Sequence, residues 1–131
     1  MIDVAPGAES SPLAAILADL VRRNITLDKA KRVEFERLRG AVALVADDHR
    51  TSLTLRFDFG RLIVHTGVVG VPDLTLRGPI AALENLGERT SRGLLGLARS
   101  DGAAGRGELK VYGLWTHPLL VRRLARVLSE R

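Results

Sequence analysis

Residues that could carry chemistry are few and scattered in this chain of 131 residues. The three histidines, His49, His65 and His117, show no metal-ligand spacing such as His-x-x-x-His, and no carboxylate cluster accompanies them. Asp47 and Asp48 fit a hairpin turn, because such turns use aspartate side chains to hydrogen-bond their own backbone. There is no cysteine, which excludes disulfides, thiolate metal sites and cysteine nucleophiles. We therefore predict no catalytic residue, no metal and no cofactor, and hence a protein that is not an enzyme.

The glycine-rich stretch at residues 102–107 does not match a phosphate-binding loop. Such a loop lies between a strand and a helix, so that the amino terminus of the helix faces the anion. Here the glycines lead into an expected strand, and no Lys-Ser/Thr pair follows them. We interpret the stretch as a connector.

Two helices are expected in the first third of the chain. Ser10 and Ser11 offer a hydroxyl cap, and Pro12 favours the first helical turn. The apolar stripe that follows at helical spacing consists of Leu13, Ile16, Leu17, Leu20 and Val21. A second, more polar helix is expected over residues 26–38, and Gly40 would end it.

Apolar segments of strand length follow, separated by turn residues. The segment 52–59 alternates most clearly, with Leu53, Leu55, Phe57 and Phe59 on one face. The expected strands are residues 41–46, 52–59, 62–65, 74–77 and 108–112. Further helices are expected after Gly78-Pro79 and from Pro118. The short connections predict an α+β fold in which helices cover one face of a five-stranded, mostly antiparallel sheet.

Length and composition are typical of one domain, which we place at residues 10–131 after a flexible leader at 1–9. Hydrophobic residues make up 46% of the chain, enough to fill a core, whereas aromatic residues make up only 4%. No apolar run approaches the roughly 20 residues that cross a bilayer, and the first residues do not read as a signal peptide. A cytoplasmic location is therefore expected.

The net charge of +5 is concentrated in two segments. Residues 22–39 and residues 106–131 each carry a net charge of +4, whereas residues 1–21 carry −3. Such segments favour contact with an anionic surface, or they keep the domain in solution. The candidates for contact with an anionic membrane are Arg22, Arg23, Arg122, Arg123 and Arg126. Nucleic acid is the less favoured partner, because no strand interleaves aromatic and basic side chains.

Residues 41–131 resemble the sterol carrier protein type 2 family. The resemblance rests on Gly60-Arg61-Leu62-Ile63-Val64, on the segment from Pro72 to Gly78, and on the segment from Gly107 to Gly113, followed by an apolar terminal helix. It departs from the family at the glycine-rich loop and at the carboxyl end, which lacks a Ser-Lys-Leu peroxisomal address.

The resemblance implies a hydrophobic tunnel between the sheet and the helices. Members of the family bind and move sterols, fatty acids, acyl-CoA or phospholipids without chemistry, and some bacterial relatives are accessory factors for isoprenoid-quinone intermediates. Carried over by position, the tunnel face comprises Leu55, Phe57, Phe59, Leu74, Leu76, Leu83, Leu86, Leu109 and Val111. The mouth or lid comprises Leu114, Trp115, Leu120 and Leu124.

Two functions thus remain open for the apolar layer. It would either hold a hydrophobic small molecule, for transfer or storage, or be a filled core in a scaffold or protein-interaction domain, including an accessory factor for lipid or quinone biosynthesis. Periodicity does not distinguish a hollow core from a filled one. Neither the ligand nor the oligomeric state follows from the sequence.

Overall fold

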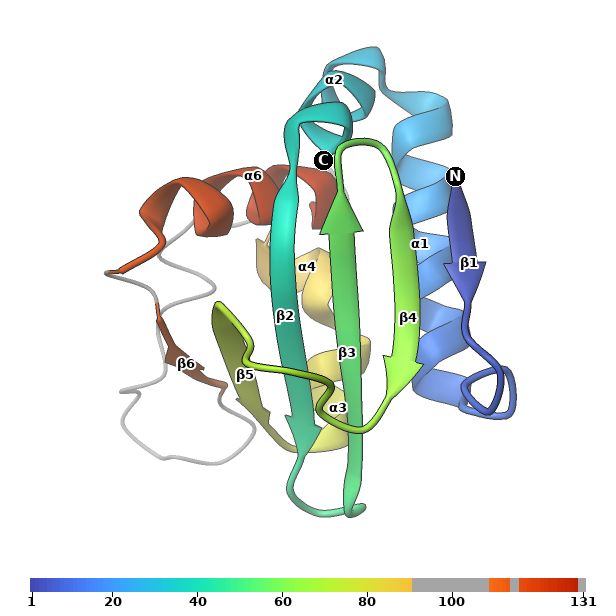
Figure 1. Ribbon diagram of the computed structural model, residues 1–131, viewed down its shortest axis with the longest axis vertical. Helices are drawn as coiled ribbons and strands as arrows, with labels where there is room; N and C mark the ends of the chain where they lie inside the picture. The colour runs from blue at the N-terminus through green and yellow to red at the C-terminus, as the bar shows by residue number, and fades with distance from the viewer. Residues whose placement is uncertain (91–108, 114–115, 130–131) are drawn as a thin grey trace.

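The computed structural model describes residues 1–90, 109–113 and 116–129, and it shows one sheet with the helices on one of its faces (Figure 1). The strands are β1 (Ile2–Val4), β2 (Arg39–Ala46), β3 (Thr51–Asp58), β4 (Leu62–Thr66), β5 (Leu74–Gly78) and β6 (Lys110–Tyr112). The helices are α1 (Pro12–Leu27), α2 (Lys29–Arg37), α3 (Ile80–Glu84), α4 (Leu86–Thr90) and α6 (Pro118–Leu128). The predicted connector at residues 102–107 lies outside the described residues.

The sheet differs from the prediction in its number of strands and in their direction. It has six strands in the order β1-β4-β3-β2-β5-β6, not five. It is mixed rather than mostly antiparallel, because β1 pairs with β4 and β5 pairs with β2 in parallel. The connection from β4 to β5 passes across the sheet in front of β3 and β2 and so delivers β5 beside β2 (Figure 1). The prediction assumed that each strand pairs with the next along the chain.

The additional strand is β1, which lies within the segment expected to be a flexible leader. Ile2 is paired with Leu62 and Val4 with Val64. The terminal ammonium group of Met1 donates a hydrogen bond of 2.9 Å to the carbonyl oxygen of Gly60. These bonds fasten the first residues to the edge of the sheet.

The two helices at the start of the chain begin at polar caps. The Ser11 hydroxyl accepts a hydrogen bond from the backbone N–H of Ala14, so the predicted start of α1 is confirmed. The Asp28 carboxylate accepts hydrogen bonds from the N–H groups of Ala30 and Lys31 and starts α2. The predicted second helix began at residue 26, but residues 26 and 27 continue α1.

One face of the sheet packs on the helices and forms the core. Val42 and Leu44 of β2 and Leu53 and Leu55 of β3 are fully buried there. Intervening residues such as Arg56 point to the opposite face, which we call the open face, as the two-residue period of a strand requires. The prediction of helices over one face is therefore confirmed.

Candidate functional site

Most of the side chains predicted to line a tunnel lie together in one buried layer between the sheet and the helices, which we call the inner layer. They are contributed by β3, β5, α3, α4 and α6 and by the residue before β6. None has more than 8% of its surface exposed: Leu55, Phe57, Leu74, Leu76, Leu83, Leu86, Leu109, Leu120 and Leu124. Leucine makes up nearly all of the layer, and Phe35 of α2 packs edge-on against Phe57.

The remaining predicted lining residues are placed differently. Val111 is half-buried and packs against the inner layer from β6. Phe59 is 61% exposed. Leu114 and Trp115 lie outside the described residues, so their assignment to the mouth stays a prediction.

Phe59 leaves the inner layer because β3 ends one residue earlier, at Asp58. The chain then turns, with Phe59 at a φ of 45°, a conformation that is uncommon for a bulky residue. Its N–H is bonded to the carbonyl oxygen of Leu38, and the guanidinium carbon of Arg39 lies 6.0 Å from its ring centroid. The strict alternation predicted for 52–59 therefore stops before its last residue.

Helix α6 covers part of the inner layer and is strongly amphipathic. Its buried residues are Leu120, Val121, Leu124, Ala125, Val127 and Leu128. Arg122 and Arg126 lie on its exposed side. In Figure 1 the helix crosses behind β2, on the same side of the sheet as α1 and α4.

Two polar side chains from the first helices hold the carboxyl end of α6. The amide of Asn24 donates hydrogen bonds of 2.8 Å to the carbonyl oxygen of Val127 and 2.9 Å to that of Ser129. The ammonium group of Lys31 donates to the same Ser129 oxygen. These bonds satisfy carbonyl groups that a helix end leaves without an intrahelical partner.

The sequence analysis did not identify either residue, although a signal for Asn24 is present. Asn24 follows Leu20 and Val21 by four and three residues and so continues the apolar stripe of α1. A polar residue on such a stripe is buried and needs a partner. The partner itself, 103 residues away, has no local signal.

The arginines predicted to contact a membrane fall into two groups. Arg22 and Arg23 lie on α1, where Arg22 forms a 2.7 Å ion pair with Asp19. Arg122, Arg123 and Arg126 lie on α6. Arg123 is half-buried and donates a 2.9 Å hydrogen bond to the carbonyl oxygen of Arg37. That bond ties Arg123 to α2, so the exposed cations of α6 are Arg122 and Arg126.

The polar residues considered for chemistry in the turn between β2 and β3 are engaged in local contacts. Asp48 accepts a 2.9 Å hydrogen bond from the N–H of Ile80 and lies 3.1 Å from Nδ1 of His49. The hydrogen bond with His49, and then that with Ile80, hold the pKa of Asp48 below its ordinary value. Asp47 pairs with Arg77 at 2.6 Å. Within the described residues, no group of three or more histidine and acidic side chains could hold a metal ion.

The other two histidines also lie apart. Nε2 of His65 is buried, with no hydrogen-bond partner among the described residues. His117 occupies the residue before α6, but its side chain forms no capping bond there, and its Nε2 lies 3.9 Å from a carboxylate oxygen of Asp73.

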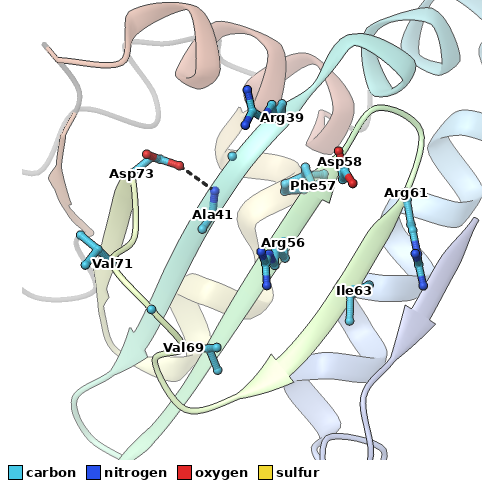
Figure 2. A pocket seen from close by; sticks show the side chains of 12 residues that line it. Arg39, Ala41, Arg56, Phe57, Asp58, Arg61, Ile63, Val69, Val71 and Asp73 are labelled. Carbon is cyan, nitrogen blue, oxygen red and sulfur yellow. Dashed lines mark hydrogen bonds between the residues drawn. The ribbon is translucent and has the colours of Figure 1, made fainter.

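A hollow lies on the open face of the sheet. It has a volume of about 480 Å³, and Figure 2 shows its lining side chains over β2, β3 and β4, bordered by the connection from β4 to β5. Its charged residues are Arg39, Arg56, Arg61, Asp58 and Asp73. A smaller hollow of about 220 Å³ lies between α2 and the carboxyl end of α6. Neither hollow is part of the inner layer.

The arrangement of helices and strands matches known structures. A solved structure described as "UbiJ-SCP2 Ubiquinone synthesis protein" has a TM-score of 0.64 and 25% sequence identity, with 88% of this chain and 91% of that chain covered. A crystal structure of sterol carrier protein 2 has a TM-score of 0.56 and 17% identity, with 88% and 95% covered. This chain has an SCP2-like fold. A scan against models of protein families and a search of curated proteins found no match.

The family resemblance seen in the sequence is thus confirmed at the level of the fold. The inner layer of the SCP2-like domain lies between its sheet and its helices, and it is the candidate site for an apolar ligand. In the part of the chain that the structure describes, no helix is long and apolar enough to span a membrane.

Proposed function

We propose that this SCP2-like domain binds a hydrophobic small molecule of the sterol, fatty-acid, phospholipid or isoprenoid type in its inner layer, without chemistry. The observation that carries the proposal is the gathering of leucines from five helices and strands into one buried layer beneath α6. The two solved structures compared above bear names linked to sterol carriage or ubiquinone synthesis.

Hydrophobic burial alone supplies enough free energy for such binding. An alkyl chain that buries about 300 Å² of apolar surface gains roughly 7 kcal/mol at about 25 cal/mol per Å², before the cost of association. No polar anchor is required. Leucine side chains, unlike stacked aromatic rings, adjust to flexible chains by changing rotamer.

The ligand would enter by displacement of the amino-terminal end of α6. The carboxyl end is held by Asn24 and Lys31, whereas the amino-terminal His117 makes no side-chain cap. Leu120, near that end, is the most exposed of the buried residues of the helix at 8%. In this proposal the exposed Arg122 and Arg126 bring α6 to an anionic membrane, where lipid is taken up.

A second candidate is a scaffold or accessory domain of the same fold with a filled core. Leu53, Leu55 and Leu76 have no exposed surface, as in an ordinary core. Such a domain would act in lipid or quinone biosynthesis through a protein partner rather than by holding the intermediate.

Enlarging Leu120 tests the proposed entry and binding. We expect Leu120→Trp to weaken binding of a fluorescent fatty acid about 10-fold or more, because the indole would fill space beneath the amino-terminal end of α6. Binding is measured by titration of delipidated protein, and native mass spectrometry of the purified wild-type protein is expected to show one bound lipid.

The matched control is Leu119→Trp, one residue earlier on the same helix. Leu119 is 55% exposed, so its replacement is expected to change affinity less than 2-fold. Thermal unfolding of both variants checks that they fold. Wild-type protein that binds no fatty acid and carries no lipid would refute the carrier proposal and favour the filled-core candidate.

A further inference from the structure

The register of the sheet brings three arginines together on the open face. Arg39 pairs with Asp58 across β2 and β3. The N–H of Asp58 donates to the carbonyl oxygen of Arg61. Arg61 therefore lies beside Asp58 on the side away from Arg39. Arg56 precedes Asp58 by two residues and so shares its face. Arg39, Arg56 and Arg61 therefore line the same hollow as Asp58, at separate points around it (Figure 2).

These guanidinium groups are weakly engaged by the protein itself. Arg56 is exposed and forms no hydrogen bond or ion pair within the described part of the chain. The Arg39 guanidinium lies over the ring of Phe59, and Arg61 lies 3.9 Å from the Asp3 carboxylate, a long ion pair. The three arginines and two aspartates that line the hollow carry a formal net charge of +1.

The second carboxylate of the hollow is committed to the backbone. The Asp73 side chain accepts a 2.9 Å hydrogen bond from the N–H of Ala41, drawn in Figure 2. The N–H of Asp73 donates in turn to the carbonyl oxygen of Ala41. Asp73 therefore holds the start of β5 against β2 rather than pairing with the arginines.

The opposite side of the hollow is apolar and preformed. Ile63, Val69 and Val71 line it, the two valines coming from the connection between β4 and β5. The buried hydroxyl of Thr54 donates a 2.7 Å bond to the carbonyl oxygen of Gly67 and accepts a 3.0 Å bond from the N–H of Val69. This pair of bonds fixes the connection above the sheet.

We propose that this hollow, which we call the arginine hollow, binds a phosphorylated compound that carries a short apolar group. Guanidinium groups match phosphate oxygens with two parallel hydrogen bonds, and a phosphate monoester supplies more than one negative charge to a cluster of cations. The volume of about 480 Å³ falls in the range of small-molecule sites. The phosphate belongs either to a free ester or to a lipid headgroup.

The proposal is independent of ligand binding in the inner layer. The arginine hollow lies on the face of the sheet opposite the helices, and its Arg56 and Ile63 side chains point away from the inner layer (Figure 2). Either site could exist without the other.

Calorimetric titration with hexyl phosphate tests the arginine hollow. We expect Arg56→Gln to weaken binding about 10-fold or more, because a charge-assisted hydrogen bond is lost. Arg50→Gln, which removes the same charge from the exposed turn between β2 and β3, is expected to change affinity less than 2-fold. Inorganic phosphate, which lacks the apolar group, is expected to bind more weakly than hexyl phosphate.

Sedimentation with phosphatidylcholine vesicles, with and without phosphatidic acid, identifies the source of the phosphate. Loss of hexyl phosphate binding in Arg56→Gln supports a free ester. Loss of vesicle binding in Arg56→Gln but not in Arg50→Gln, with hexyl phosphate bound only weakly by the wild type, supports a headgroup. If Arg56→Gln binds both probes as the wild type does, or if the wild type binds neither, the proposal is overturned.

Discussion

Replacing Gly113 with alanine is expected to lower the free energy of unfolding by about 2–5 kcal/mol. Gly113 follows β6 with a φ of +97°, and a Cβ atom built there would lie 2.4 Å from the carbonyl oxygen of Asp73. That oxygen has little freedom to move, since Asp73 is bonded to Ala41 through both its N–H and its side chain. The strain of a positive φ and the clash with the carbonyl oxygen of Asp73 therefore both lower the stability of Gly113→Ala.

The matched control is Gly70→Ala, in the connection between β4 and β5. Gly70 also has a positive φ, +72°, but nothing lies within 4 Å of its Cβ position. Gly70→Ala is therefore expected to lower the free energy of unfolding by about 1–2 kcal/mol, from the strain of a positive φ alone. Urea unfolding of the two variants measures the difference, and equal losses would contradict the close approach of β6 to the start of β5.

Replacing Asn24 with leucine is expected to cost about 2–3 kcal/mol of stability. The carbonyl oxygen of Val127 would lose its side-chain donor in a buried position, and that of Ser129 would lose the Asn24 amide and keep the Lys31 ammonium. Because the lost bonds end on α6, amide hydrogen exchange is expected to accelerate more in α6 than in the sheet.

Thr26→Val on the same helix is the control for Asn24→Leu. The hydroxyl of Thr26 donates to the carbonyl oxygen of Arg22 at an exposed position, so its loss is expected to change stability by no more than about 0.5 kcal/mol. A loss of stability in Asn24→Leu with unchanged exchange in α6 would show that the two bonds do not hold that helix.

Local signals allowed much of the fold to be predicted. Ser11 and Pro12 fix the start of α1 through a cap and a preset φ, and both act within one helical turn. The alternation in residues 52–58 assigns each side chain of β3 to a face. These features depend on near neighbours in the sequence, which a sequence displays directly.

Features that depend on distant partners could not be predicted in the same way. The three residues of β1 gain their strand conformation from pairing with β4, about 60 residues later, and carry no alternation long enough to read. The parallel pairing of β5 with β2 follows from the path of the connection across the open face. Neither the path nor the edge position of β1 is encoded in a local pattern.

The two candidate sites differ in the same way, because one follows from local patterns and the other from residues distant in the sequence. The leucines of the inner layer could be predicted from periodicity and from resemblance to a family. The arginine hollow could not, because Arg39 of β2, Arg56 of β3 and Arg61, just before β4, line one hollow only through the pairing of these strands. Phe59 was assigned to the inner layer because the sequence does not mark the turn that ends β3 at Asp58.

Ligand binding in the inner layer is tested most directly by photo-crosslinking with a fatty acid that carries a diazirine near its methyl end. Labelled peptides are then mapped by mass spectrometry. The expected labels fall on β5 and α6, around Leu76 and Leu124, with one label per protein molecule. Labels confined to the connection between β4 and β5, or no saturable labelling, would contradict binding between the sheet and the helices.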